Sequence, residues 1–102
     1  MLSILIVGPF EIEIASSGPD LEVLRAQDSE EAIEKLARNR RIDAILLLAE
    51  VPAFSVIQQI REENPAPPPI FVAAGTRAVP AGAHPVPGDP VLALKRLLNH
   101  LE

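Results

Sequence analysis

The sequence predicts an α/β fold, organised as a single three-layer domain around a parallel sheet. Strand-like and helix-like segments alternate along the 102 residues with short links between them, which is the order of a parallel sheet with helical crossovers. The strand-like runs are apolar almost without a break, as in strands that helices cover on both faces. A chain of this length is near the commonest domain size, so we expect residues 1–102 to form one domain.

The first predicted strand covers residues 3–7 and ends at Gly8-Pro9. Residues 21–26 alternate between apolar and polar side chains and should therefore lie nearer an edge of the sheet. Residues 42–48 form the most hydrophobic run of the chain. They should be the central strand.

The second half of the chain predicts two more strands joined without a helix. Residues 70–74 should form the fourth strand, and residues 84–86 a very short fifth strand that its proline confines to an edge. Residues 75–83 contain Gly, Pro and Ala with almost no periodicity, so we expect a loop there.

Three helices carry clear start signals or apolar stripes. Asp28 lies three residues before Glu31, the spacing of a capping box, and Asp89 followed by proline resembles a helix cap with proline at the first helical position. A further helix should cover residues 53–63. Side chains at helical spacing should face the core, namely Ala32, Ile33, Leu36, Ala37, Phe54, Val56, Ile57, Ile60, Val91, Leu94, Leu97, Leu98 and Leu101.

Residues 9–18 allow two interpretations. Proline at position 9, acids in the first turn and Gly18-Pro19 at the end favour a short helix. The alternation of Glu and Ile over residues 11–14 favours a strand, which would add an antiparallel hairpin. We expect the helix.

Composition excludes several classes of function. The net charge of −5 disfavours nucleic acid as a partner, because neutralising phosphates needs clustered Lys and Arg. The chain has no cysteine, which excludes disulfides, thiolate catalysis and cysteine-bound zinc. The apolar start, residues 1–7, is too short to span a membrane and has no basic leader. We expect a cytoplasmic protein that does not act at a membrane.

Four segments, in their order and spacing, resemble the receiver domain of two-component response regulators. Residues 28–33 (DSEEAI) resemble the opening of that family's second helix, and residues 43–48 (DAILLL) resemble its third strand. Residues 56–61 (VIQQIR) resemble its third helix, and residues 82–90 resemble the segment that leads into its last helix. The resemblance covers essentially the whole chain.

The resemblance implies a flavodoxin/CheY-like sheet with strand order 2-1-3-4-5. Against the family pattern, the first helix is shortened and the fourth helix is missing. Residues 49–54, together with Gln58-Gln59, are also similar to the pseudo-receiver of the cyanobacterial clock protein KaiA.

The residues that carry the family's chemistry are all replaced. A receiver holds magnesium with an acidic pair after its first strand and phosphorylates an aspartate at the end of its third strand. It senses the phosphoryl group with a hydroxyl residue and a lysine. The corresponding positions here are Gly8, Pro9, Leu48, Ala73 and Val86.

These replacements predict a pseudo-receiver that is not an enzyme. Phosphoryl transfer needs a divalent cation and a cationic clamp for the developing charge, and neither is offered by these positions. We expect no catalytic, metal-binding or cofactor-binding residues at the site. Restoring Leu48 to aspartate should not restore phosphorylation.

A few other side chains could carry chemistry, each with a plainer explanation. Glu50 could mimic a phosphoryl group at the carboxyl edge of the sheet. No lysine is placed to pair with it, so we expect it to be a solvated loop residue. His84, assigned to the carboxyl side of the sheet, and His100 are read as ordinary surface imidazoles, and nothing has the spacing of a metal site. Ser16-Ser17 lack a supporting His or Asp.

The resemblance also implies an interaction surface. In a receiver the first and last helices cover one face of the sheet and the other helices cover the opposite face, so a shortened first helix and a missing fourth helix should leave apolar strand exposed on both faces. Exposed apolar patches of this kind mark interaction sites. We expect the surface to include Ile70, Phe71, Val72, Val79 and Val86.

The sequence therefore predicts a signalling or scaffolding module that acts through protein–protein contact, independently of phosphorylation. Its partner is another protein or, most simply, a second copy related by two-fold symmetry. Two alternatives stay open. One is a small ligand, such as a nucleotide or quinone, at the carboxyl edge of the sheet, and the other is phosphorylation of a non-aspartate acceptor such as His84 or a serine.

Overall fold

A five-stranded parallel sheet forms the centre of the molecule. The computed structural model describes residues 2–8, 21–38, 41–48, 51–74 and 78–101. The strands lie in the order β2-β1-β3-β4-β5 and every neighbouring pair is parallel. They are β1 (Leu2–Val7), β2 (Leu21–Ala26), β3 (Ala44–Leu47), β4 (Ile70–Ala73) and β5 (His84–Val86).

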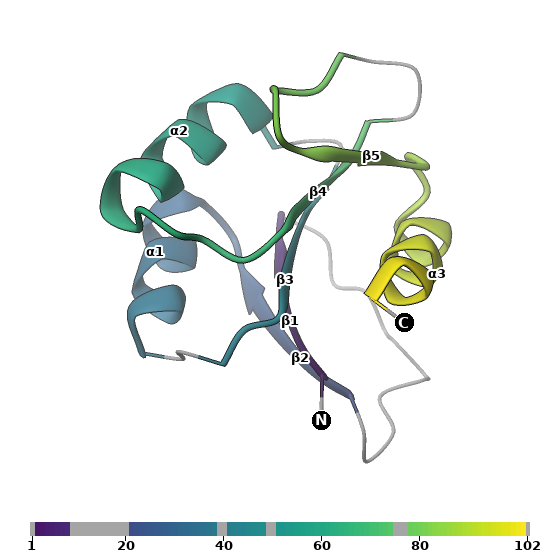
Figure 1. Ribbon diagram of the computed structural model, residues 1–102, viewed down its shortest axis with the longest axis horizontal. Helices are drawn as coiled ribbons and strands as arrows, with labels where there is room; N and C mark the ends of the chain where they lie inside the picture. The colour runs from purple at the N-terminus through teal and green to yellow at the C-terminus, as the bar shows by residue number, and fades with distance from the viewer. Residues whose placement is uncertain (1, 9–20, 39–40, 49–50, 75–77, 102) are drawn as a thin grey trace.

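Three helices cover the sheet from two sides. Helices α1 (Ser29–Arg38) and α2 (Ala53–Glu63) lie side by side on one face, and α3 (Pro90–Leu101) covers the other face (Figure 1). The predicted fold class, with its strand order 2-1-3-4-5, is thereby confirmed. The Pro9–Gly18 segment lies outside the described residues.

The two aspartates at helix starts act as caps, as predicted. The Asp28 carboxylate accepts a hydrogen bond of 2.9 Å from the backbone N–H of Glu31, and the Asp89 carboxylate accepts one of 3.1 Å from the N–H of Leu92. Each cap satisfies one of the N–H groups that a first helical turn leaves without a partner. Helix α2 follows Pro52 and has no side-chain cap.

The core is aliphatic and centred on β1, β3 and β4. All four residues of β3 and all four of β4 are buried, which confirms β3 as the central strand and explains its unbroken apolar sequence. Asp43, just before the start of β3, extends the pairing with β1. Its backbone N–H donates a 2.7 Å hydrogen bond to the Ser3 carbonyl, and its carboxylate accepts one of 2.7 Å from the Ser3 N–H. No polar or charged side chain among the described residues is buried.

The connection from β4 to β5 contains no helix in its described part, residues 74 and 78–83. A parallel crossover usually carries a helix over the sheet. Here Arg61 of α2 reaches across the gap and donates a 2.9 Å hydrogen bond to the Ala81 carbonyl. Gly82 has a φ of +86°, and a Cβ there would lie 2.9 Å from the Arg61 guanidinium, so the turn depends on glycine.

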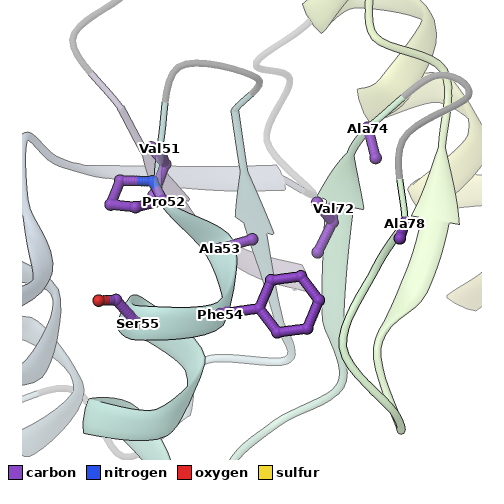
Figure 2. Close-up of a pocket in the computed structure, with 8 residues that line it drawn as sticks. All are labelled: Val51, Pro52, Ala53, Phe54, Ser55, Val72, Ala74 and Ala78. Atoms are coloured by element: carbon purple, nitrogen blue, oxygen red, sulfur yellow. The ribbon is translucent and has the colours of Figure 1, made fainter.

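Three predicted core side chains face solvent instead. Phe54 is 61% exposed, Val91 is 53% exposed, and Ala37 is also exposed. Phe54 projects from α2 toward β4 (Figure 2), on the side where the described part of the β4–β5 connection has no helix that would cover it. At the start of α3, Ala93 takes the buried position instead of Val91.

Candidate functional site

The carboxyl edge of the sheet brings together the positions at which receiver chemistry would be expected. Gly8 and Leu48 directly follow β1 and β3, while Ala73 and Val86 are the last residues of β4 and β5 and pair with one another. Parallel strands present their carboxyl ends at a shared edge, where α/β folds bind ligands. Pro9 and Glu50 lie outside the described residues.

Leu48 fills the centre of this edge. Its side chain is only 1% exposed, and its backbone N–H donates a 3.0 Å hydrogen bond to the Val7 carbonyl. This bond continues the pairing of β3 with β1 by one residue, and the Leu48 side chain lies in the core. Leu48 is therefore a core residue that follows the last residue of the central strand.

Gly8 gives Leu48 the space that it occupies. A Cβ built on Gly8 would lie 2.8 Å from both the Cβ and the Cδ1 of Leu48, and the φ of Gly8 is +154°. Side chains are strained at this φ, and a Cβ contact at that distance is a clash. Gly8 and Leu48 therefore form one packed unit with no room for a side chain at position 8.

The remaining two positions are apolar and closed. Ala73 is fully buried and Val86 is 7% exposed. Neither side chain can donate a hydrogen bond to a phosphoryl group or neutralise its charge. Among the described residues there is also no group of three or more His, Asp or Glu side chains that could hold a metal ion.

A hollow of about 450 Å³ opens beside this edge, between α2 and β4. Figure 2 shows Phe54 with its ring turned toward Val72 of β4, while Ser55 points away from the ring. We call this the α2–β4 hollow. Its lining is mostly apolar and consists of Val51, Pro52, Ala53, Phe54, Ser55, Val72, Ala74 and Ala78.

A hydrogen bond between Arg61 and Ala81, called here the Arg61 bridge, joins α2 to the β4–β5 connection. Helix α2 runs antiparallel to the strands, so Phe54 lies near the carboxyl edge and Arg61 lies two turns further toward the amino edge. Neither Arg61 nor Ala81 is among the described residues that line the α2–β4 hollow.

Most of the predicted interaction surface is buried in the single chain, although Val72 lines the α2–β4 hollow. Ile70, Phe71, Val72 and Val86 are buried within the single chain, and Val79 is half-buried. The helices α2 and α3 and the β4–β5 connection cover them. The exposed apolar side chain on this face is Phe54.

His84 is also placed differently from the prediction. It is the first residue of β5 and so lies at the amino edge of the sheet, opposite the edge that holds Leu48. Its ring stacks on Phe71 at 4.9 Å between ring centres, and the ring of His100 lies 4.8 Å from it. Ser16 and Ser17 lie outside the described residues.

One feature of the sequence indicates an exposed Phe54 beside the α2–β4 hollow. The stripe of α2 includes Phe54, but the segment that would cover Phe54 has no helical pattern. An apolar stripe of a helix is exposed to solvent where no second element packs against it. The Arg61 bridge, by contrast, has no signature in the sequence.

No protein-family model matches this chain. No curated protein matches it either. None of the described helices is long and apolar enough to cross a membrane.

Two solved structures share the fold. One chain of the crystal structure of the phosphorylated P1 domain of CheA3 in complex with CheY6 from R. sphaeroides matches with a TM-score of 0.66 and 25% identity, over 98% of this chain and 95% of that chain. The lysine decarboxylase LdcF of Francisella novicida matches with a TM-score of 0.64 and 17% identity, over 97% of this chain but 16% of that chain. The first likeness and the parallel five-stranded sheet fit a CheY-like domain of two-component signalling.

Proposed function

We propose that this chain is a pseudo-receiver: a non-catalytic signalling or scaffolding module of the cytoplasm that binds a protein partner without being phosphorylated. The observation that carries the proposal is the packing of Leu48 against Gly8. These two residues fill the place of phosphoryl chemistry with buried hydrocarbon, and a Cβ at position 8 would meet Leu48 at 2.8 Å. An apolar side chain has no lone pair to attack phosphorus and no charge to hold magnesium.

The exposed apolar side chains support a binding role at the same edge. Among the described residues, the large hydrophobic side chains exposed to solvent are Phe54, Val91 and Leu92. All three lie in the first turns of α2 and α3, which begin at the carboxyl edge because these helices run antiparallel to the strands. Such side chains at one edge are the kind of surface that partners cover.

The α2–β4 hollow is the part of this edge best suited to a partner. It combines a concave apolar lining with the exposed ring of Phe54, and aromatic anchors dominate the binding energy of protein interfaces. A partner segment that presents apolar side chains would occupy the place that a receiver gives to its fourth helix. A second copy of this chain is one such partner.

The likeness to a chain of the CheA3–CheY6 complex adds support. That structure is an assembly of two signalling proteins. The strand order of this chain is that of CheY, so protein–protein signalling is a function that the fold serves. The 25% identity is compatible with conserved architecture and altered chemistry.

The proposal is tested by capture of partners from an extract of the source cells, quantified for the wild type and for Phe54→Ser. The serine variant should lose at least ~10-fold in captured partner, because truncating an aromatic anchor costs on the order of 2 kcal/mol or more. Val91→Ser is the comparison variant that tests whether the α2–β4 hollow or the rest of the edge binds the partner, since it removes a similarly exposed apolar side chain from the first turn of α3, outside the hollow. Light scattering of the purified chain measures its molar mass in solution, and a mass of two chains would show that a second copy is the partner.

Treatment with acetyl phosphate and magnesium should leave the captured amount unchanged. Capture that requires the phosphodonor would overturn phosphorylation-independence. Equal loss in Phe54→Ser and Val91→Ser would move the binding surface away from the α2–β4 hollow.

A second candidate function rests on the size of the same hollow. Its volume of about 450 Å³ lies within the range of pockets for small molecules. The described residues of the lining carry no charged side chain, so an uncharged apolar ligand suits them better than a nucleotide. A thermal-shift screen would favour this function if an apolar compound stabilised the wild type but not Phe54→Ser.

A further inference from the structure

Both histidines of the chain meet at the amino edge of the sheet. His84 begins β5, and His100 lies in the last turn of α3, which returns to this edge because α3 runs antiparallel to the strands. Their ring centres are 4.8 Å apart. The buried ring of Phe71 packs against both, at 4.9 Å from His84 and 5.2 Å from His100.

The two imidazoles are accessible and have free nitrogens within the described part of the chain. His84 is half-buried and His100 is exposed. Neither ring has a hydrogen bond or an ion pair to another described residue; the contacts of both are with aromatic rings. A neutral imidazole without another partner is the commonest protein ligand for a transition metal ion.

The separation of the rings fits two ligands of one ion. A metal ion about 2.0 Å from one nitrogen of each imidazole lies about 3.2 Å from each ring centre. Ring centres 4.8 Å apart then subtend about 97° at the ion, given that metal–nitrogen distance. This angle lies between the cis angle of an octahedron and the angle of a tetrahedron. The second torsion of histidine is broad, so the rings can turn their nitrogens toward a shared point while keeping their rotamers about the first torsion.

We infer that His84 and His100 together bind one divalent ion of the late first transition series, with water at its other positions. Imidazole suits copper, nickel and zinc, and the general affinity order places copper first. Magnesium and calcium prefer oxygen ligands and should not bind here. The site lies at the opposite edge from Leu48 and is independent of the proposed function.

Such an ion would join the last turn of α3 to the edge strand β5. The sequence did not reveal the site, because the two histidines are far apart in the chain and only the return of α3 brings them together. With two protein ligands, the site leaves positions open, unlike a structural zinc site closed by four side chains. The ion should therefore exchange and can accept a further ligand from outside the chain.

The test is a calorimetric titration of tag-free protein with copper, nickel and zinc chlorides, with magnesium chloride as the control salt. We expect one ion per chain, copper binding most tightly, and no heat of binding with magnesium. At an ion concentration of 100 times Kd, the Tm should rise by about 10 °C. His84→Gln and His100→Gln should each weaken binding by at least ~10-fold, because each leaves a single imidazole.

A second readout needs no variant. Paramagnetic nickel should broaden the imidazole NMR signals of both histidines in the wild type at substoichiometric amounts. The inference is overturned if the ion binds only at millimolar concentration, if both glutamine variants keep the wild-type affinity, or if the signals of only one histidine broaden. Binding through the amino terminus alone would leave the affinity of both glutamine variants unchanged.

Discussion

The side chain of Leu48 occupies the space beside Gly8 in which a side chain at position 8 would have to stand. A Cβ on Gly8 would lie 2.8 Å from the Cβ of Leu48 and 2.8 Å from its Cδ1. The replaced positions are thus coupled physically as well as chemically. A side chain at position 8 could not be placed without displacing Leu48.

Gly8→Ala should destabilise the fold by about 2 kcal/mol or more, because it combines an unfavourable φ with a clash in a closed core. Urea denaturation of the variant and the wild type measures this difference. The double variant Gly8→Ala/Leu48→Ala should remain destabilised, since the Cβ of Leu48 itself makes one of the two closest contacts. A Gly8→Ala protein as stable as the wild type would contradict the packing.

Leu48→Asp should destabilise the chain by several kcal/mol, because it buries a carboxylate at a position that is 1% exposed. Leu48→Met is the matched control, as it keeps the volume and polarity and should cost less than about 1.5 kcal/mol. Both are measured by urea denaturation at pH 7. If the aspartate variant proved as stable as the methionine variant, position 48 would have to be open to water.

Gly82→Ala should destabilise by about 1 kcal/mol, since φ at this position is +86° and the new Cβ would displace the Arg61 guanidinium. The displaced guanidinium would also lose its bond to the Ala81 carbonyl. Arg61→Ala in the Gly82 background separates the two effects, because it removes the bond and leaves the turn unstrained. Equal stability of wild type and Gly82→Ala would show that another contact holds the β4–β5 connection.

Loss of either helix cap should cost about 1 kcal/mol. Asp28→Ala removes the acceptor for the Glu31 N–H, and Asp89→Ala removes the acceptor for the Leu92 N–H. The asparagine variants at both positions keep an acceptor oxygen and should retain most of the stability. Thermal melts of the four variants check this order, and equal losses in the alanine and asparagine variants would show that the aspartates act only through their charge.

The order and placement of the elements could be predicted from the sequence because their signals are local. The unbroken apolar run of β3 marks a strand buried on both faces, and Asp28 and Asp89 mark helix starts through hydrogen bonds within one turn. The positions that correspond to the receiver's functional residues could be recognised from the sequence for the same reason, because each lies at a fixed distance from the end of a strand.

The surface could not be predicted because it depends on which elements meet. Helical periodicity marks Phe54 as part of a stripe but does not say whether anything lies opposite it. The buried state of Ile70 and Val72 depends on how α2 and the β4–β5 connection lie against β4. The meeting of His84 with His100 likewise follows from the direction in which α3 returns.

The measurement that tests the central claim most directly is the intact mass of the wild-type chain after incubation with acetyl phosphate and magnesium. An ordinary receiver domain treated in parallel shows that the phosphodonor is active. Since Leu48 and Gly8 close the site with hydrocarbon, the mass of this chain should stay unchanged, and the Leu48→Asp variant should also gain nothing. A mass increase of one phosphoryl group on the wild type would contradict the account.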